Sequence, residues 1–325
     1  MPQHADVPPI SLATWPTPLE PMPRLAERLG LGPTDLWVKR DDLIGPGGGG
    51  NKVRKLERTL AELVKDGAEV IVTSGAPQSN HARLTAAAGA RFGLPVVLVL
   101  EGTAPDVEAG NLLLDRMLGA RIQWAGDVDR AGLDAALQAQ AAAIERDGRR
   151  VGIVPFGGSN ATGARAYQDA GRELLEQAGH IDTVVVAVGS GGTMAGLVSS
   201  LGPDAVLGVD CGAVPDSAER VHRMWQEVSG TDGATVADLR IRHDLVGDGY
   251  EVFTEPVRHA MQTLARTEGI ILDPVYTGRA AAGLIRSVED GTIAAGSRTV
   301  LMHTGGLPGL FGHPDAAPWR DARDQ

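Results

Sequence analysis

Short runs of apolar, mostly β-branched residues alternate along this chain with segments whose apolar residues recur every three or four positions. The first pattern is typical of strands buried on both faces of a sheet, and the second is typical of helices that pack on such a sheet. This alternation predicts an α/β fold with parallel sheets flanked by helices. The predicted strands are 69–73, 95–101, 121–125, 151–156, 183–189, 205–210 and 299–304.

Seven or more parallel strands fit two α/β lobes better than one. In such sheets, ligands bind at the carboxyl ends of the strands or between the lobes, so the residues after each strand are candidate site residues. Glycine supplies 43 of the 325 residues, about twice its ordinary share of about 7%. This abundance suits helices packed closely on a sheet and backbone that approaches a ligand.

Composition excludes several classes of protein. The chain has 30 Lys and Arg against 41 Asp and Glu, a net charge of −11, which argues against a nucleic-acid partner. Its single cysteine, Cys211, excludes a disulfide framework, and His303 lacks the spacing of a metal ligand. The uncharged stretch 183–203 fits a strand, a turn and a helix better than a membrane span. We therefore expect a cytoplasmic protein without a metal or a membrane partner.

The segment GGNKVRKLE at 49–57 places Lys52 and Lys55 near the predicted start of a helix. A helix N-terminus disfavours cations, which should lower the pKa of a lysine there, as a Schiff-base lysine requires. Two cations at this place also suit an anionic ligand. The alternative is an ordinary basic helix face in solvent.

Two further clusters follow predicted strands. In TSGAPQSNHAR at 73–83, Ser79 or Asn80 can cap the next helix, whose free N–H groups could hold a carboxylate; simple capping is the alternative. In VGSGGTMAG at 188–196, a glycine turn leads into a helix, as in phosphate-binding loops. A dinucleotide fingerprint is the alternative, but Met194 stands where its third glycine should be. A single phosphate is favoured, held by Gly189, Ser190, Gly191, Gly192 and Thr193.

Tyrosine occurs only three times, and two of these residues, Tyr250 and Tyr276, lie in glycine-flanked or polar segments of the C-terminal third. A phenol near a reacting carbon can act as an acid, a base or a hydrogen-bond anchor. Taken singly, a tyrosine in such a place is more often a core or rim residue than a catalytic one.

Taken together, these motifs resemble one family over nearly the whole chain, from residue 18 to the last glycine turn. It is the D-cysteine desulfhydrase and 1-aminocyclopropane-1-carboxylate (ACC) deaminase family of pyridoxal-phosphate enzymes, which have the tryptophan-synthase-β-like fold, or fold type II. The resemblance implies a homodimer with a large cofactor-binding lobe, 1–50 plus 160–325, and a small lobe, 51–159. The motifs are GGNKVRKLE, SGAPQSNHAR, GNLLLDRMLGA, PFGGSNATGARAY, GSGGTMAGL, DPVYTGRAAAGL and HTGG.

The resemblance also implies how pyridoxal 5'-phosphate is held. Lys52 would be the Schiff-base lysine and would later move the Cα proton. Lys55 and the turn at 189–193 would hold the phosphate, Asn80 would bond the phenolic oxygen, and Thr277 would meet the pyridine nitrogen.

For the amino-acid substrate, the resemblance implies that Ser79, with Asn80 and His81, binds the carboxylate. Tyr250 and Tyr276 would face the substrate. With Lys52, these two tyrosines and Ser79 would be the catalytic residues.

The residue after Tyr276 divides the family, because ACC deaminases carry Glu there and desulfhydrase-like members carry Thr. Thr277 therefore places this chain with the desulfhydrase-like members. A hydroxyl does not keep the pyridine nitrogen protonated as a carboxylate does, so the cofactor ring withdraws electrons less strongly. Such a ring suits a substrate with a good leaving group on its β carbon. We expect β-elimination of D-cysteine to pyruvate, sulfide and ammonia. Pro77 and Met194 depart from the family pattern, so L-cysteate and ACC remain alternative substrates. An NAD-linked oxidoreductase and a non-catalytic binding protein are further alternatives.

Overall fold

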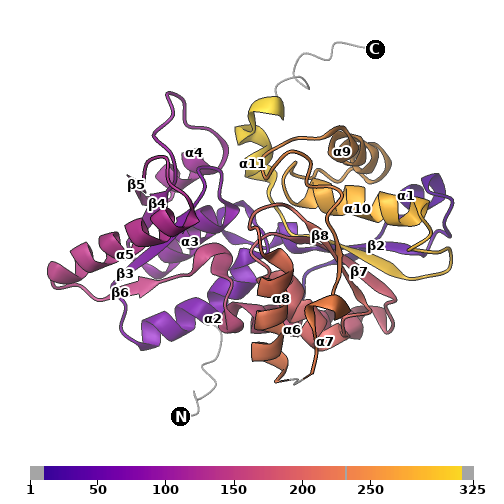
Figure 1. Cartoon of the computed structure of the whole chain (residues 1–325), viewed down its shortest axis with the longest axis horizontal. Coiled ribbons are helices and arrows are strands. Elements are labelled where there is room, and N and C mark those ends of the chain that lie inside the picture. Colours follow the sequence, from indigo (N-terminus) through magenta and orange to yellow (C-terminus); the bar gives the residue numbers. More distant parts are fainter. Residues whose placement is uncertain (1–10, 231–232, 317–325) are drawn as a thin grey trace.

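The computed structural model describes residues 11–230 and 233–316, which form two sheets with helices packed on both faces (Figure 1). Every strand predicted from the sequence is present, and the predicted α/β class is confirmed. Three short strands, β1, β2 and β9, were not predicted. Strand β2 has the sequence LWVKR, in which polar Lys39 and Arg40 break the apolar pattern although Lys39 is fully buried.

The larger sheet has the strand order β1-β2-β10-β7-β8-β9. Its neighbouring strands are parallel except for β1 and β2, which are antiparallel. The strands are β1(Leu19–Pro21), β2(Leu36–Arg40), β7(Thr183–Val188), β8(Val206–Asp210), β9(Arg240–Arg242) and β10(Thr299–His303). The helices of this part are α1(Pro23–Arg28), α6(Ala161–Ala178), α7(Gly192–Leu201), α8(Ser217–Ser229), α9(Glu255–Glu268), α10(Thr277–Glu289) and α11(Leu307–Gly312).

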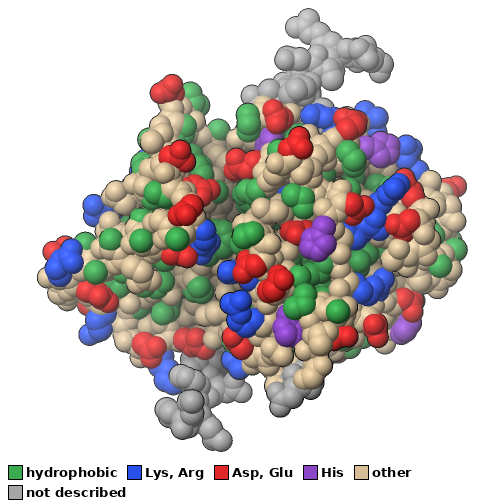
Figure 2. All heavy atoms as spheres, viewed as in Figure 1, with side chains coloured by type: hydrophobic (Ala, Val, Ile, Leu, Met, Phe, Trp, Pro, Cys, Tyr) green, Lys and Arg blue, Asp and Glu red, His purple; other side chains and the backbone are tan. Residues whose placement is uncertain are grey.

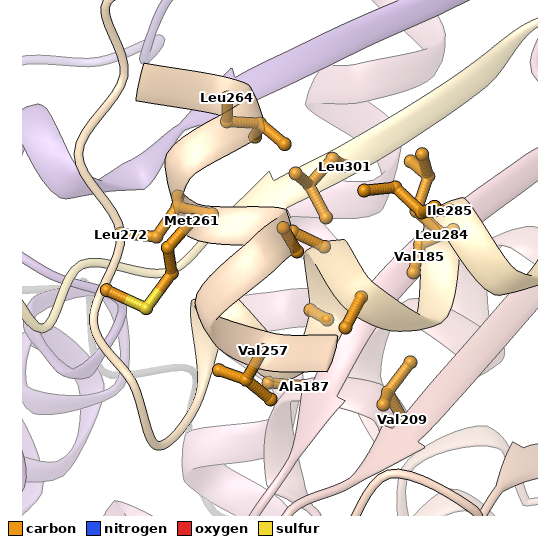
Figure 3. Close-up of a cluster of buried hydrophobic side chains, with 14 of the residues drawn as sticks. Val185, Ala187, Val209, Val257, Met261, Leu264, Leu272, Leu284, Ile285 and Leu301 are labelled. Carbon is orange, nitrogen blue, oxygen red and sulfur yellow. The ribbon is translucent and has the colours of Figure 1, made fainter. Parts of the chain in front are cut away.

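Strand β7 shows why the central strands of this sheet are apolar throughout. Successive side chains of a strand point to opposite faces, so Val185 packs with α1, α9 and α10 while Val184 and Val186 pack with α6, α7 and α8. Figure 3 shows the first of these cores, where Val185 and Val209 lie opposite side chains of α9 and α10.

The smaller sheet is wholly parallel and has the order β5-β4-β3-β6. One of its faces packs on α2, α3 and α4, and the other on α5. Its strands are β3(Val70–Gly75), β4(Val96–Leu100), β5(Arg121–Trp124) and β6(Val151–Ile153). Its helices are α2(Lys52–Lys65), α3(Asn80–Phe92), α4(Gly110–Met117) and α5(Arg130–Arg146).

A buried ion network joins α2 to the larger sheet. The Arg54 guanidinium on α2 donates to Asp41, which directly follows β2, at 3.0 Å, and to Glu173 on α6 at 2.9 Å. Lys39 Nζ lies 2.5 Å from the same Glu173 carboxylate. Because both cations share one acid, Glu173 fixes the start of α2 against α6.

The stretch 183–203 forms β7, a turn and α7, and none of the described helices is long and apolar enough to span a membrane. On the face drawn in Figure 2, Lys and Arg side chains are interspersed with Asp and Glu.

Candidate active site

A cavity of about 230 Å³ lies between the two sheets and collects most of the residues that the sequence analysis singled out. Residues from the smaller sheet and its helices are Lys52, Lys55, Ser79, Asn80 and His81. Residues from the larger sheet and its loops are Gly189, Ser190, Gly191, Thr193, Tyr250 and Tyr276. The motifs therefore converge on one site, although Lys52 and Tyr276 are 224 residues apart in the chain.

Lys52 is the first residue of α2 and follows a run of glycines with positive φ. A Cβ atom on Gly49 would lie 2.0 Å from the Asp42 carbonyl oxygen, so this approach to α2 requires glycine. Burial lowers the pKa of Lys52 to about 8, against the opposing influence of Asp273. The direction is the one expected from the sequence, but burial is its main cause. The Lys52 ammonium lies 5.5 Å from the centroid of the Tyr276 ring.

Lys55 is buried one turn further along α2. Its Nζ donates to Ser159 Oγ at 2.9 Å and to the Gly157 carbonyl oxygen at 3.3 Å. Burial, and then the charge of Lys52, lower its pKa well below the ordinary value. A ligand anion at this place would stabilise the charged form of Lys55.

The glycine turn after β7 forms a concave surface beside Lys55. Gly191 caps α7 in the left-handed conformation, with φ of 92°, and no side chain caps the helix. A Cβ on Gly192 would lie 2.7 Å from Ser159 Oγ and 3.1 Å from Lys55 Nζ. Gly192 does not line the cavity itself, but its N–H donates to Ser159 Oγ at 3.3 Å. The N-terminus of α7 and Lys55 together suit a phosphate group.

The start of α3 forms the opposite wall. Ser79 is the N-cap of α3 and its Oγ accepts a hydrogen bond from the Ala82 N–H at 3.1 Å, as the capping interpretation predicted. The amide oxygen of Asn80 accepts from Asn111 Nδ2 at 3.1 Å, which fixes the Asn80 side chain. The remaining N–H groups of the first turn of α3 are those that a carboxylate can use.

His81 has a defined tautomer. The Thr73 hydroxyl donates to the Val154 carbonyl oxygen, so His81 Nε2, 2.8 Å from Thr73 Oγ1, is the donor of that pair. Burial, and then the charge of Lys52, lower the His81 pKa well below its ordinary value. The buried Nδ1 is therefore an acceptor, and it has no partner among the described residues. A ligand with a donor group would satisfy it.

Tyr250 and Tyr276 are hydrogen-bonded through their hydroxyl groups, and their rings meet edge to face with centroids 6.0 Å apart. Burial raises the pKa of both phenols, and the Tyr250 hydroxyl raises that of Tyr276 further. Both tyrosines are therefore protonated near neutral pH. A Cβ on Gly189 would lie 3.0 Å from the Tyr276 ring, so this glycine makes room for it.

Thr277 is placed differently from the other predicted residues. It is buried outside the residues that line the cavity, and its hydroxyl donates to Asp273 Oδ1 at 2.6 Å and accepts from the Asp273 N–H at 2.9 Å. Its contact with the cofactor ring stays a prediction. Of the two departures from the family pattern, Met194 packs in the core beside Gly208, and Pro77 lines an adjoining outer cavity.

Sequence reasoning missed other residues that line the cavity, among them Asn51, Thr304, Glu101, Arg130 and Phe156. Asn51 Nδ2 donates to Thr193 Oγ1 at 3.1 Å, and Thr304 directly follows β10. The position of Thr304 at a strand end was the signal available for it. Within the described residues, no group of three His, Cys, Asp or Glu side chains is placed to hold a metal ion.

Comparison with known proteins agrees with this geometry. A family model described as "Pyridoxal-phosphate dependent enzyme" matches residues 10–305. Proteins named D-cysteine desulfhydrase, from Salmonella choleraesuis (strain SC-B67) and Salmonella typhi, are 38% identical over 97% of this chain and 99% of their own length.

Solved structures give the same result. One described as the ACC deaminase homologue is 32% identical, with a TM-score of 0.85 over 96% of this chain and 98% of its own. A threonine deaminase isoform 2 from Solanum lycopersicum, 20% identical with a TM-score of 0.64 over 89% of this chain and 83% of its own, shares the fold. These matches give no support to an NAD-linked oxidoreductase. Its sequence, its fold and the matched length show that this chain belongs to the family of pyridoxal-phosphate-dependent enzymes.

Proposed function

We propose that this protein is a carbon–sulfur lyase that converts D-cysteine and water into pyruvate, hydrogen sulfide and ammonia. Its similarity to proteins named D-cysteine desulfhydrase over nearly their full length supports this substrate. The observation that carries the proposal is Lys52, a lysine with a pKa of about 8 that lines the cavity beside Tyr276. Such an amine is a competent base and nucleophile close to neutral pH.

The residues of the cavity fit pyridoxal phosphate. The N-terminus of α7 has no side-chain cap and Lys55 is buried beside it, so an anionic phosphate finds both backbone N–H donors and a cation there. In our proposal, Lys55 and residues 189–193 would hold the phosphate, Lys52 would hold the carbonyl carbon until the substrate amine replaces it, and Asn80 would face the phenolic oxygen. When bound, the cofactor withdraws electrons from the Cα atom of an amino acid.

The chain's own residues position the substrate and move its protons. Ser79 and the first turn of α3 hold the α-carboxylate, so the Cα–H bond is directed at Lys52. Lys52 takes the Cα proton, the Cβ–S bond breaks, and its electron pair leaves with sulfur. The released 2-aminoacrylate takes up water to give pyruvate and ammonia. Tyr250 and Tyr276 are both protonated and one hydroxyl donates to the other, which leaves one O–H of the pair free to donate to the substrate.

The test is to give the cofactor-loaded enzyme D-cysteine and to measure pyruvate and sulfide in the same sample. We expect equal amounts of the two products and their loss in Lys52→Ala. Lys65→Ala is the control, because Lys65 is an exposed lysine at the other end of α2. Undiminished sulfide release by Lys52→Ala would refute the role of Lys52, and absence of both products from the wild type would refute the substrate.

A second candidate is deamination of ACC, favoured by the similarity to the solved ACC deaminase homologue. It predicts 2-oxobutanoate from ACC. If ACC gives product and D-cysteine gives none, the deaminase activity replaces the proposed one.

We further propose a homodimer in the cytoplasm. Ile271 and Leu310 line a shallow groove, and exposed Phe311 follows Leu310 on α11, so an apolar surface is available for self-association. The single buried cysteine suits a reducing compartment. Light scattering should give twice the chain mass of 33.9 kDa; a mass of one chain would exclude the dimer.

A further inference from the structure

We propose that Arg279 is a positioning residue for Tyr250. Its guanidinium holds the turn at 249–252 against α10, and this places the Tyr250 hydroxyl beside that of Tyr276 at the cavity. The assignment rests on the proposed function, in which this pair of tyrosines faces the substrate, and it gives a task to a buried cation that the mechanism has not used.

Tyr250 comes from a segment without regular secondary structure. Residues 243–254 are described throughout and form neither a helix nor a strand. The Val252 N–H donates to the Gly249 carbonyl oxygen at 3.3 Å, so Tyr250 lies in the middle of a turn. Glu251, the next residue, is exposed. Because a surface turn of this kind can adopt many positions, contacts from elsewhere in the fold have to fix this one.

Arg279 supplies such contacts from the interior. It lies on α10 and is fully buried. Its Nη2 donates to the carbonyl oxygens of Gly249 at 2.8 Å and Val252 at 2.9 Å, which are the two ends of the turn. Its Nη1 donates to the carbonyl oxygen of Cys211, directly after β8. One guanidinium therefore joins the turn, α10 and the end of β8.

The helix that holds the turn also carries the second tyrosine. Tyr276 is the N-cap residue of α10, and Arg279 follows it by three residues, within one helical turn. The hydroxyl groups of Tyr250 and Tyr276 are hydrogen-bonded, and their ring centroids are 6.0 Å apart. Since Arg279 and Tyr276 belong to one rigid element, the contacts of Arg279 set the distance between the two tyrosines.

His313, directly after α11, holds the same turn from another side. Its Nδ1 accepts from the Asp315 N–H at 3.2 Å, so its Nε2 is the donor to the Glu251 carbonyl oxygen, 2.9 Å away. The carbonyl groups of the turn are thus bound from two elements of the fold. The Tyr250 side chain extends from this anchored backbone and lines the cavity.

Using a buried guanidinium for this task lowers stability. The acceptors of Arg279 are neutral carbonyl groups, and its Nε has no hydrogen-bond partner among the described residues. Moving a cation from water onto neutral acceptors in the interior costs free energy. An apolar side chain would fill the space at lower cost but could not bind three carbonyl groups. The benefit of arginine at this position is therefore the fixed position of the turn.

Release of the turn would change the surroundings of Tyr250. This residue lines the main cavity and two adjoining cavities, so a small displacement would take its hydroxyl away from Tyr276 and towards solvent. Burial raises the pKa of Tyr250 above the ordinary value of 10. In solvent, that pKa would return to about 10.

The first test needs no turnover. The chain has three tyrosines, and burial raises the pKa of each. With tyrosine labelled with carbon-13 at Cζ, none of the three NMR resonances of the cofactor-loaded wild type should titrate near pH 10. In Arg279→Met, the resonance that is absent from Tyr250→Phe should titrate there, whereas that of Tyr167, in the core, should not. Arg286→Met, at an exposed arginine of the same helix, should behave as the wild type.

Arg279→Lys is the second variant, and it decides the question if Arg279→Met does not fold. An ammonium group keeps the charge but lacks the planar fork that reaches several carbonyl groups at once. The Tyr250 and Tyr276 resonances should therefore move in the same direction as in Arg279→Met, but less far. Tyrosine resonances that stay at their wild-type positions in the folded variant would overturn the proposal and leave Arg279 with a role in stability alone.

The second test is a comparison of single and double mutants. Arg279→Met, or Arg279→Lys to a smaller extent, should lower kcat for D-cysteine by about a hundredfold, as expected for a displaced group. KM should change less, because the carboxylate contacts are untouched. In Tyr250→Phe, the same substitution should have little further effect, since the hydroxyl that it positions is gone.

Equal losses of kcat with and without the Tyr250 hydroxyl would refute the assignment of Arg279. If D-cysteine gives no product in the wild type but the tyrosine resonances change as described, the proposed function fails while the positioning role of Arg279 stands.

Discussion

Lys52 and its neighbours show how burial at a single residue sets reactivity. The cavity side of α2 carries two lysines, and burial is the largest cause of the lowered pKa at both. For Lys52 the result is an amine that loses its proton at about pH 8 instead of at the 10.5 of an ordinary lysine. The ammonium form does not react with a carbonyl, so protonation of Lys52 should control how quickly it bonds the cofactor.

The first prediction follows from that pKa. When apoprotein is mixed with pyridoxal phosphate, the rate of bond formation should rise with pH, because the neutral amine of Lys52 is the reacting form. The rate should level off above about pH 8. Rapid-mixing absorbance measurements across the pH range would show this. A rate that keeps rising to the ordinary lysine pKa would contradict the burial of Lys52, and Lys52→Ala supplies the baseline.

Asp115 on α4 gives a second prediction. It is fully buried, and neither carboxylate oxygen has a hydrogen-bond partner among the described residues. Burial raises its pKa from 3.8 to about 8, although Arg83 opposes the shift. Between pH 3.8 and about pH 8, Asp115 keeps its proton in the folded protein and loses it in the unfolded chain. The free energy of unfolding therefore decreases as pH rises through this range.

Asp115→Asn should therefore gain stability relative to the wild type, and gain more above pH 8 than near the acid end of that window. Thermal unfolding at several pH values would measure it. Asp106→Asn, at an exposed position, is the matched control. A gain that is the same at every pH would show that Asp115 does not titrate as described.

The residues that sequence reasoning found and those that it missed differ in kind. Lys52 and Ser79 lie in local patterns, a glycine run before a helix and a polar cap after a strand, so the sequence reveals them. Arg130 lies in an ordinary first turn, and at the cavity wall it contacts Phe156, 26 residues away in the chain. Contacts between distant segments leave no local pattern, which is why cavity residues such as Arg130 could be identified only from the fold.

At the scale of elements, α2 has to be held against the larger sheet while it presents Lys52 and Lys55 to the cavity. The ion network around Glu173 performs this task. Although burial raises the pKa of Glu173, hydrogen bonds and charges of Arg54 and Lys39 lower it to about 2. The pairing with Arg54 therefore stabilises the fold above the ordinary pKa of 4.5 and is lost as pH falls through about 2.

Glu173→Gln should lower the free energy of unfolding by about 3 kcal/mol near neutral pH, because it leaves two buried cations short of their shared acid. This deficit should shrink as pH falls from about 5 towards about 2. Urea unfolding at several pH values would measure both effects. Glu176→Gln, exposed on the same helix, should have little effect. A deficit independent of pH would mean that lost packing, not charge, is responsible.

Strand β2 shows the limit of periodic patterns at this scale. The sequence LWVKR contains two cations and was not predicted to be a strand, yet Lys39 is fully buried in it. Its charge is tolerated because Glu173, more than a hundred residues away, lies 2.5 Å from its Nζ. The apolar strands β7 and β8 need no such partner, and their pattern was sufficient to predict them.

For the whole molecule, the two predicted lobes correspond to separate hydrophobic cores. The clusters beside the larger sheet and those beside the smaller sheet share no buried residue. We propose the division into 1–50 plus 160–325 and 51–159 as a working description. Leu12 and Ile44, however, pack in the core of the smaller sheet. The cavity lies between these cores, so a ligand touches both.

Because the two sheets have separate hydrophobic cores, we expect each sheet to unfold locally with its own free energy. In native-state hydrogen exchange at low denaturant, amides of β3 and β4 should converge on one opening free energy, and those of β7 and β8 on a larger one. The reason is that the two hydrophobic clusters on the larger sheet contain more buried residues than the two on the smaller sheet. Because Glu173 couples α2 to α6, the amides of α2 should have the larger opening free energy. In Glu173→Gln, the opening free energy of these amides should fall towards that of β3 and β4. If all four strands share one free energy and one denaturant slope in both proteins, the molecule is a single cooperative unit and the proposed division fails.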